Sequence, residues 1–165
     1  MSGYLASPWS DFSVAVVGAA AALTGLLFVA VSINIEQILA IGALAGRALS
    51  TMILFVVPLM VGIVILVPEQ SVTALGFELI GTAVLAGGGL LRVNRPANRG
   101  ALEPRSSWLL VRLVPSVTIP VFLVLAGGSL IAHVGGGLYW AAPAIVEAFA
   151  GGLATAWVLL VEIRR

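Results

Sequence analysis

Two glutamates, Glu78 and Glu147, stand inside long apolar stretches and are the residues best suited to chemistry. A charge inside a bilayer costs about 2.5–3.5 kcal/mol even on a lenient scale, so each acid must face protein or water, or be protonated. If the stretches are helices, with a rise of about 1.5 Å per residue, both acids lie roughly 10 Å below the same membrane surface. Two carboxylates at one depth can coordinate a cation, relay protons or share a proton.

Each acid has small and polar neighbours on its own helical face. These neighbours are Gly81, Thr82 and Gly89 for Glu78, and Gly151 and Thr155 for Glu147. We therefore predict a cation or polar site that comprises Glu78, Glu147, Thr82 and Thr155. The alternative is that each acid is a protonated or hydrogen-bonded group with a structural role.

A second polar group lies at the end of the first apolar stretch. Its members are Ser32, Asn34, Glu36 and Gln37. We predict that they form a vestibule or a partner-docking site at the cytoplasmic surface. The alternative is a helix end at which Glu36 meets Arg47 or Arg112, because charges at helix ends cost little.

Two ridges of small residues follow the helical repeat. The first comprises Gly18, Ala22, Gly25, Val29, Ser32 and Glu36, and the second comprises Ala144, Ala148, Gly152 and Ala156. Such ridges let helix backbones approach closely in lipid, where no hydrophobic force drives helices together. The first ridge predicts either a subunit contact around a pore or ordinary packing within the chain. Because two ridges exceed what one bundle should need, we expect self-association.

The elements that must position these residues are membrane helices. Apolar residues make up 61% of the 165-residue chain and charged residues 9%, against roughly a quarter charged in soluble domains. We predict an all-α, polytopic membrane protein with about five transmembrane helices in a single transmembrane domain, residues 1–165. The spans are expected at about 12–35, 47–67, 72–91, 108–133 and 139–163.

Local signals mark the ends of these spans. Pro68 should end the second helix, Ser71 should cap the third, and the glycines 135–137 should separate the fourth from the fifth. Pro115 and Pro120 should bend the fourth helix, because each removes a hydrogen bond. The alternative is a shorter fourth span, 115–133, preceded by an interfacial segment.

The arginines predict the orientation. All eight basic residues are arginines, and four of them lie in the one long hydrophilic run, Arg92–Arg105. With five spans every arginine falls on the same side, so the positive-inside rule places the N-terminus outside and the C-terminus in the cytoplasm. Trp9, Tyr139 and Trp140 then lie at the outer ends of their helices, as aromatic belts would place them.

Composition and motifs exclude several function classes. A net charge of +1 argues against binding to nucleic acid, and the absence of cysteine excludes disulfides and thiolate sites. No Ser-His-Asp set, H-E-x-x-H, Walker loop or G-x-G-x-x-G is found, so we expect no enzyme activity, no cofactor and no metal site. His133 is expected at the outer membrane interface, because a metal site would need further ligands.

The first span carries a resemblance. The runs Trp9-Ser10-Asp11-Phe12, Gly18 through Ala30, and Ser32-Ile33-Asn34-Ile35 resemble a family of short bacterial multi-span integral membrane proteins that has no established function. Some of its members are labelled modulators of a membrane-bound protease. The resemblance covers roughly a fifth of the chain and implies no catalytic residue. It is consistent with a multi-pass protein of the bacterial cytoplasmic (inner) membrane.

Two function classes follow. The first is a small homo-oligomeric channel or permeation pore for a cation or proton, since five short helices make too thin a wall to enclose a route alone. The second is a non-catalytic accessory or regulatory subunit of a larger membrane complex, in contact with lipid and with other membrane proteins. The intramembrane acids and small-residue ridges favour the pore. The absence of any selectivity-filter string favours the accessory subunit.

Overall fold

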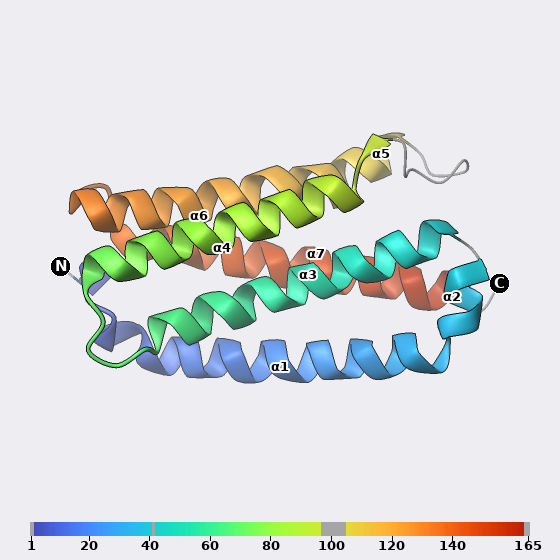
Figure 1. The fold of residues 1–165 in the computed structure, drawn as a ribbon, viewed down its shortest axis with the longest axis horizontal. Helices are drawn as coiled ribbons and strands as arrows, with labels where there is room; N and C mark the ends of the chain where they lie inside the picture. Colours follow the sequence, from blue (N-terminus) through green and yellow to red (C-terminus); the bar gives the residue numbers. More distant parts are fainter. Residues whose placement is uncertain (1, 41, 97–104, 164–165) are drawn as a thin grey trace.

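The computed structural model describes residues 2–40, 42–96 and 105–163, and its described part is helical (Figure 1). Five long helices run side by side along its longest axis: α1 Ser10–Ile33, α3 Gly42–Ile65, α4 Val72–Val93, α6 Val114–Ala132 and α7 Ala141–Ile163. Shorter elements precede or connect them: the 3₁₀ turns η1 Ser2–Tyr4 and η2 Ser7–Trp9 before α1, then α2 Ile35–Ala40, α5 Arg105–Trp108, the π-helical η4 Leu109–Leu113 and the 3₁₀ turn η5 Gly137–Trp140.

The prediction of a five-span, all-α membrane protein is confirmed. Each long helix is long and apolar enough to cross a bilayer, which needs about 20 residues. The spans cover Ser7–Ile33, Leu44–Ile65, Val72–Val93, Leu109–Ala132 and Gly137–Val161. Their outward surfaces carry large hydrophobic side chains, Leu85 and Ile33 among the most exposed, as contact with lipid tails requires.

The local end signals are also confirmed. The Ser71 side chain accepts a hydrogen bond of 3.1 Å from the backbone N–H of Ala74 and so caps α4. Pro68 follows the end of α3, where its missing N–H does no harm. Gly135, Gly136 and Gly137 have φ values of 90°, 110° and 62°, which only glycine adopts easily, and they form the turn that separates α6 from η5 and α7.

The first span ends earlier than predicted, and the loop after it is partly helical. α1 stops at Ile33, and Asn34 bonds back through its side chain to the carbonyl of Ala30 at 2.8 Å. α2 then turns toward α3 because Ile38 buries itself with Leu27 and Leu44. We expected a loop after the first span. The chain instead forms the short helix α2 there, because Ile38, which lies outside the predicted spans, packs against apolar residues of α1 and α3.

The fourth span is long, and the shorter alternative is wrong. η4 continues directly into α6, so the span begins at Leu109. Pro115 lies in the first turn of α6, where a missing N–H is tolerated. Trp108, which the shorter form would place in the interfacial segment before the span, is buried.

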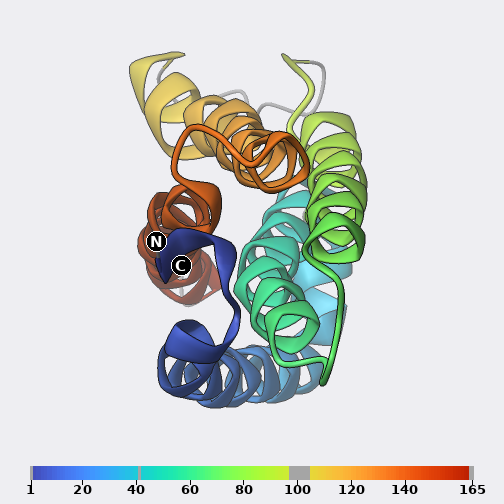
Figure 2. The same ribbon diagram turned by 90° about the vertical axis from the view of Figure 1, so that its left-hand side faces the viewer.

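The two ends of the bundle differ in character. We call the end with Trp9, Tyr139 and Trp140 the aromatic end, and the end with α2, Arg47 and Arg112 the basic end. In Figure 2, viewed from the aromatic end, α3 lies between α1 and the pair α4 and α6, with α7 on its other side. α3 contacts α1, α4 and α7, and α6 packs on α4 and α7. Only 17% of the first span is buried, against 56% of the second, so α1 is peripheral and α3 central.

The closest helix pair is α4 with α6. At their crossing, a Cβ added to Gly76 would lie 2.8 Å from the carbonyl oxygen of Gly127. Small residues at a crossing allow the backbone contact that stabilises helix pairs in lipid. A further glycine of α4 also serves packing, because Gly87 lies against the ring of Pro120.

Orientation is a prediction that labelling can test. Glu69 lies exposed at the aromatic end, and Arg95 lies exposed at the basic end. Since the chain has no cysteine, single Glu69→Cys and Arg95→Cys variants give clean probes. We expect a membrane-impermeant maleimide to label Glu69→Cys in intact cells and Arg95→Cys only after lysis, because arginines stay inside. The opposite labelling would reverse the orientation. Glu69 is preferred to Ser71 because Ser71 caps α4.

Candidate functional site

Glu78 lies on the exposed face of α4 and reaches back toward the aromatic end. Its carboxylate accepts a hydrogen bond of 2.5 Å from the side-chain amide of Gln70, which lies in the turn between α3 and α4. Helical side chains tilt toward the N-terminus of their helix, and the N-terminus of α4 is at the aromatic end. The carboxyl group of Glu78 therefore lies closer to the aromatic end than its backbone position implies.

Glu147 lies deeper and is half-buried between α7 and α6. Its carboxylate accepts a hydrogen bond of 2.5 Å from the hydroxyl of Thr118. Thr118 stands near the middle of the span Leu109–Ala132, and Glu147 near the middle of Gly137–Val161. This is a polar contact between two helices at membrane depth, where an unpaired group would be costly.

The two acids hydrogen-bond to different segments and at different depths. The threonines predicted to complete their site do not bond to them: Thr82 donates to the carbonyl of Glu78, and Thr155 donates to the carbonyl of Gly151. These bonds satisfy each hydroxyl within its own helix. A cation site that both acids form within one protomer does not follow from these contacts, and it stays a prediction for an assembly.

The polar group after the first span is divided between two helices. Ser32 donates to the carbonyl of Phe28 within α1, and Asn34 closes that helix. Glu36 and Gln37 lie exposed on α2, beyond the corner. The four side chains therefore surround a bend at the basic end, and their role as a vestibule or docking site stays a prediction.

The two small-residue ridges differ in burial: one packs inside the chain and the other is exposed. The second packs inside the chain: Ala144, Ala148 and Gly152 are buried, and a Cβ on Gly152 would meet the ring of Phe55 of α3. The first faces outward and ends at Ser32, so Glu36 does not belong to it. We call its residues the α1 ridge: Gly18, Ala22, Gly25, Val29 and Ser32, all exposed.

The α1 ridge lies opposite the face that packs on α3. The buried residues of α1 include Val16, Ala20 and Leu27. Gly18 is two residues from both Val16 and Ala20, about 200° around a helix. Nothing lies within 4 Å of a Cβ added to Gly18 or Gly25. The alternative that this ridge packs within the chain is therefore wrong.

Sequence reasoning missed a buried polar cluster at the basic end. Asn94 caps the C-terminus of α4, and its amide nitrogen donates to Ser50 Oγ of α3 at 3.1 Å and to Ser116 Oγ of α6 at 3.0 Å. Ser116 in turn donates to the carbonyl of Arg112 in η4. We call these residues, with their buried neighbours on α3, the three-helix polar cluster: Arg47, Ser50, Thr51, Asn94, Arg112 and Ser116.

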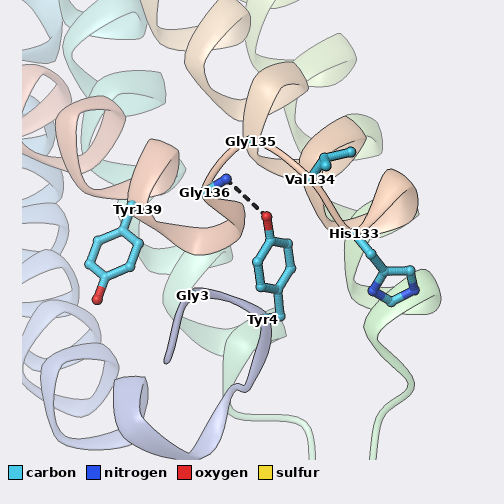
Figure 3. Close-up of a pocket in the computed structure, with 7 residues that line it drawn as sticks. All are labelled: Gly3, Tyr4, His133, Val134, Gly135, Gly136 and Tyr139. Atoms are coloured by element: carbon cyan, nitrogen blue, oxygen red, sulfur yellow. Dashed lines mark hydrogen bonds between the residues drawn. The ribbon is translucent and has the colours of Figure 1, made fainter. Parts of the chain in front are cut away.

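A cavity of about 550 Å³ opens at the aromatic end (Figure 3). It is lined by the N-terminal turn and the α6–η5 loop: Gly3, Tyr4, His133, Val134, Gly135, Gly136 and Tyr139. The Tyr4 hydroxyl accepts a 3.0 Å hydrogen bond from the N–H of Gly136, which fastens the N-terminal turn to the loop. His133 is exposed and ends α6 with φ 55°, in agreement with its predicted place at the interface. The walls are mostly apolar, so the cavity offers little to hold a charged ligand.

Comparison with protein-family models, with curated protein sequences and with solved structures finds no match for this chain. The fold and its contacts therefore carry the functional argument. The resemblance of the first span to short bacterial multi-span proteins stays a prediction.

Proposed function

We propose that this protein acts through assembly in the bacterial cytoplasmic membrane, where copies associate through the α1 ridge and the oligomer serves as a non-catalytic subunit of a larger membrane complex. The observation that carries this proposal is the open face of α1. Gly18 and Gly25 lie on the side away from α3, with nothing of their own chain near them.

The physical argument rests on the comparison between α1 and α7. In lipid, a ridge of small residues gains stability only when another helix packs closely against it. On α7 that partner is α3, whose Phe55 lies against Gly152. On α1 no described segment of the chain fills the equivalent place, so we assign it to a helix of a second copy. Ser32 and Thr24 do not need this contact, because each hydroxyl bonds to its own helix.

Substitution on the ridge tests this assembly. Gly25→Leu should weaken self-association by about tenfold or more, which corresponds to about 1.4 kcal/mol, because the added side chain holds two backbones apart. The measurement is the mass of the purified protein in detergent across a concentration series, with crosslinking in membranes.

Gly128→Leu is the matched control for this test. Gly128 is also an exposed helical glycine with nothing within 4 Å, but it lies on α6. It should leave the oligomer unchanged. A monomeric wild type, or equal effects of Gly25→Leu and Gly128→Leu, would remove the proposal.

A second candidate function is a cation or proton pore through the oligomer. The observation that favours it is Glu147, a half-buried acid near mid-membrane that a second helix holds through Thr118. Ionisable groups at this depth often belong to ion or proton routes. In this candidate the route forms between protomers, and Glu78 serves near its mouth at the aromatic end.

Flux measurements separate the two candidates. Glu147→Gln keeps the shape and most of the hydrogen bonding of the side chain but removes the charge. If Glu147 lines a route, this variant should fold normally and reduce cation or proton flux in proteoliposomes to the level of empty liposomes. Glu78→Gln should behave alike if both acids serve one route. If liposomes that contain the wild-type protein are no more permeable than empty liposomes, the pore is excluded. The accessory subunit then remains as the proposed function.

A further inference from the structure

The cavity at the aromatic end has the size and setting of a ligand site, and neither candidate function uses it. Its volume of about 550 Å³ falls within the ~300–1,000 Å³ that is typical of small-molecule sites. Val134 and Tyr139 border the cavity and are 65% and 57% exposed. Because aromatic side chains at the ends of spans lie at the edge of the bilayer, the cavity is within reach of a molecule dissolved in lipid.

The frame of the cavity is held by contacts within the chain. The N-terminal turn and the α6–η5 loop touch at Gly3 and Gly137, where a Cβ on Gly137 would overlap the carbonyl oxygen of Gly3. Within the loop, Ser129 Oγ accepts a 2.6 Å hydrogen bond from the N–H of Gly137, and Trp140 Nε1 donates to the carbonyl of Gly135 at 2.6 Å. These backbone groups are already paired, so the side chains of the cavity are left to select a ligand.

Two side chains of the cavity have a hydrogen to donate. The Tyr4 hydroxyl accepts from the N–H of Gly136, and no described residue accepts the hydrogen of that hydroxyl. His133 is exposed, and its ring nitrogens bond to no described residue. At least one nitrogen of an imidazole carries a hydrogen in either protonation state. The cavity therefore presents two donors, one from each of the segments that form it.

Aromatic rings form much of the remaining wall. The centroids of the Tyr4 and His133 rings lie 6.3 Å apart, and Tyr139 packs edge-on against Trp9 at 5.1 Å. In Figure 3, Tyr4 stands between Tyr139 and His133. Aromatic side chains gain from offset stacking or edge contact with another ring. Since the walls are mostly apolar and charged groups are costly to bury, these features suit a neutral flat ring that carries hydrogen-bond acceptors.

We infer that this cavity binds a lipid-soluble quinone, with one ring carbonyl accepting from Tyr4 and the other from His133. A quinone is a flat neutral ring whose two carbonyl oxygens accept hydrogen bonds, and its hydrocarbon tail stays in the lipid. The ester carbonyls of a phospholipid are also acceptors, but they lie on flexible chains, which lose more freedom on binding. The inference is independent of the oligomer, because the cavity includes no residue of the α1 ridge.

The test uses the full-length protein in a mild detergent. Its unfolding midpoint is measured with added decylubiquinone, with 1-decanol, with phosphatidylcholine and with no addition. Decylubiquinone at about ten times its Kd should raise the midpoint of the wild type by roughly 4 °C, because a ligand that binds only the folded state stabilises it. Decanol has the same tail without the ring, and phosphatidylcholine has ester carbonyls without the ring. Each of these should shift the midpoint by less than about 1 °C.

Substitutions at the two donors locate the effect. Tyr4→Phe should weaken the affinity for decylubiquinone about tenfold, because a hydrogen bond is lost while the ring stays. His133→Gly should weaken it by a similar factor, and glycine adopts the φ of 55° at this position without strain. Tyr139→Phe is the matched control, since it removes a hydroxyl from a ring of the same cavity that has no donor role in the inference, and it should keep the affinity. Native mass spectrometry of bound quinone gives the same comparison for variants of lower stability.

Four results would overturn the inference. The first is a wild type whose midpoint does not respond to decylubiquinone and that carries none in native mass spectrometry. The second is an equal shift with 1-decanol, which would show that only the tail binds. The third is a shift with phosphatidylcholine as large as that with the quinone, which would assign the cavity to lipid ester carbonyls. The fourth is an unchanged affinity in both Tyr4→Phe and His133→Gly, which would place the bound quinone elsewhere on the protein.

Discussion

Replacing Gly127 with alanine should lower the free energy of unfolding by about 1–3 kcal/mol or more, the usual range for overpacking. A Cβ at this position would lie 2.4 Å from the backbone carbonyl oxygen of Gly76, so the helices α4 and α6 must move apart. Because these helices form the closest crossing of the bundle, their separation loosens every contact along the pair. The measurement is unfolding of the purified protein from mild detergent by a denaturing detergent.

The neighbouring residue provides the control. Gly128 is exposed on α6, and nothing lies within 4 Å of an added Cβ. Gly128→Ala should leave stability unchanged or raise it by up to about 1 kcal/mol, since alanine favours the helix over glycine. Equal losses at both positions would contradict the crossing described here.

Replacing Asn94 with leucine should cost about 2–4 kcal/mol. The change removes the two hydrogen bonds that join α4 to α3 and α6, and it leaves two buried hydroxyls without their donor. Asn34→Leu is a matched control, because Asn34 also caps a helix but its side chain bonds to the carbonyl of Ala30 in the same helix and joins no other helix. The same unfolding measurement applies, and a loss at Asn34 as large as at Asn94 would show that capping alone explains the effect.

The five spans could be predicted because the signals that define them are local. A run of about 20 apolar residues is sufficient to mark a span in lipid. Ser71 and the glycines 135–137 determine the conformation of the backbone beside them, so their roles could also be predicted from the sequence. The corner at Asn34 was harder to predict, since α2 owes its place to Ile38 packing against residues from α1 and α3.

The candidate site could be predicted only in part, because its contacts are tertiary. The depth of Glu78 and Glu147 was counted along the backbone, whereas their partners Gln70 and Thr118 come from other segments. The two small-residue ridges look alike in sequence, and only the presence of Phe55 beside one of them distinguishes their roles.

The polar cluster was hidden by its place in the chain. Asn94 lies within the hydrophilic run that contains most of the loop arginines, and such a run indicates a solvated surface. In the fold, Asn94 caps the C-terminus of α4, and its side chain is buried. Arg112 itself gave some warning, because an arginine inside an apolar stretch needs a polar neighbour.

The contact pattern around α3 also has a consequence for biosynthesis. α1 and α3 pack as one hairpin, and α4 and α6 pack as another through their glycines. α7, which follows both hairpins in the chain, contacts both α3 and α6. Until it is inserted, the main contact between the two hairpins among the described residues is that of α3 with α4, so a nascent chain halted before residue 141 holds two pairs that share one principal interface. We therefore expect synthesis of α7 to complete the packing of the five helices.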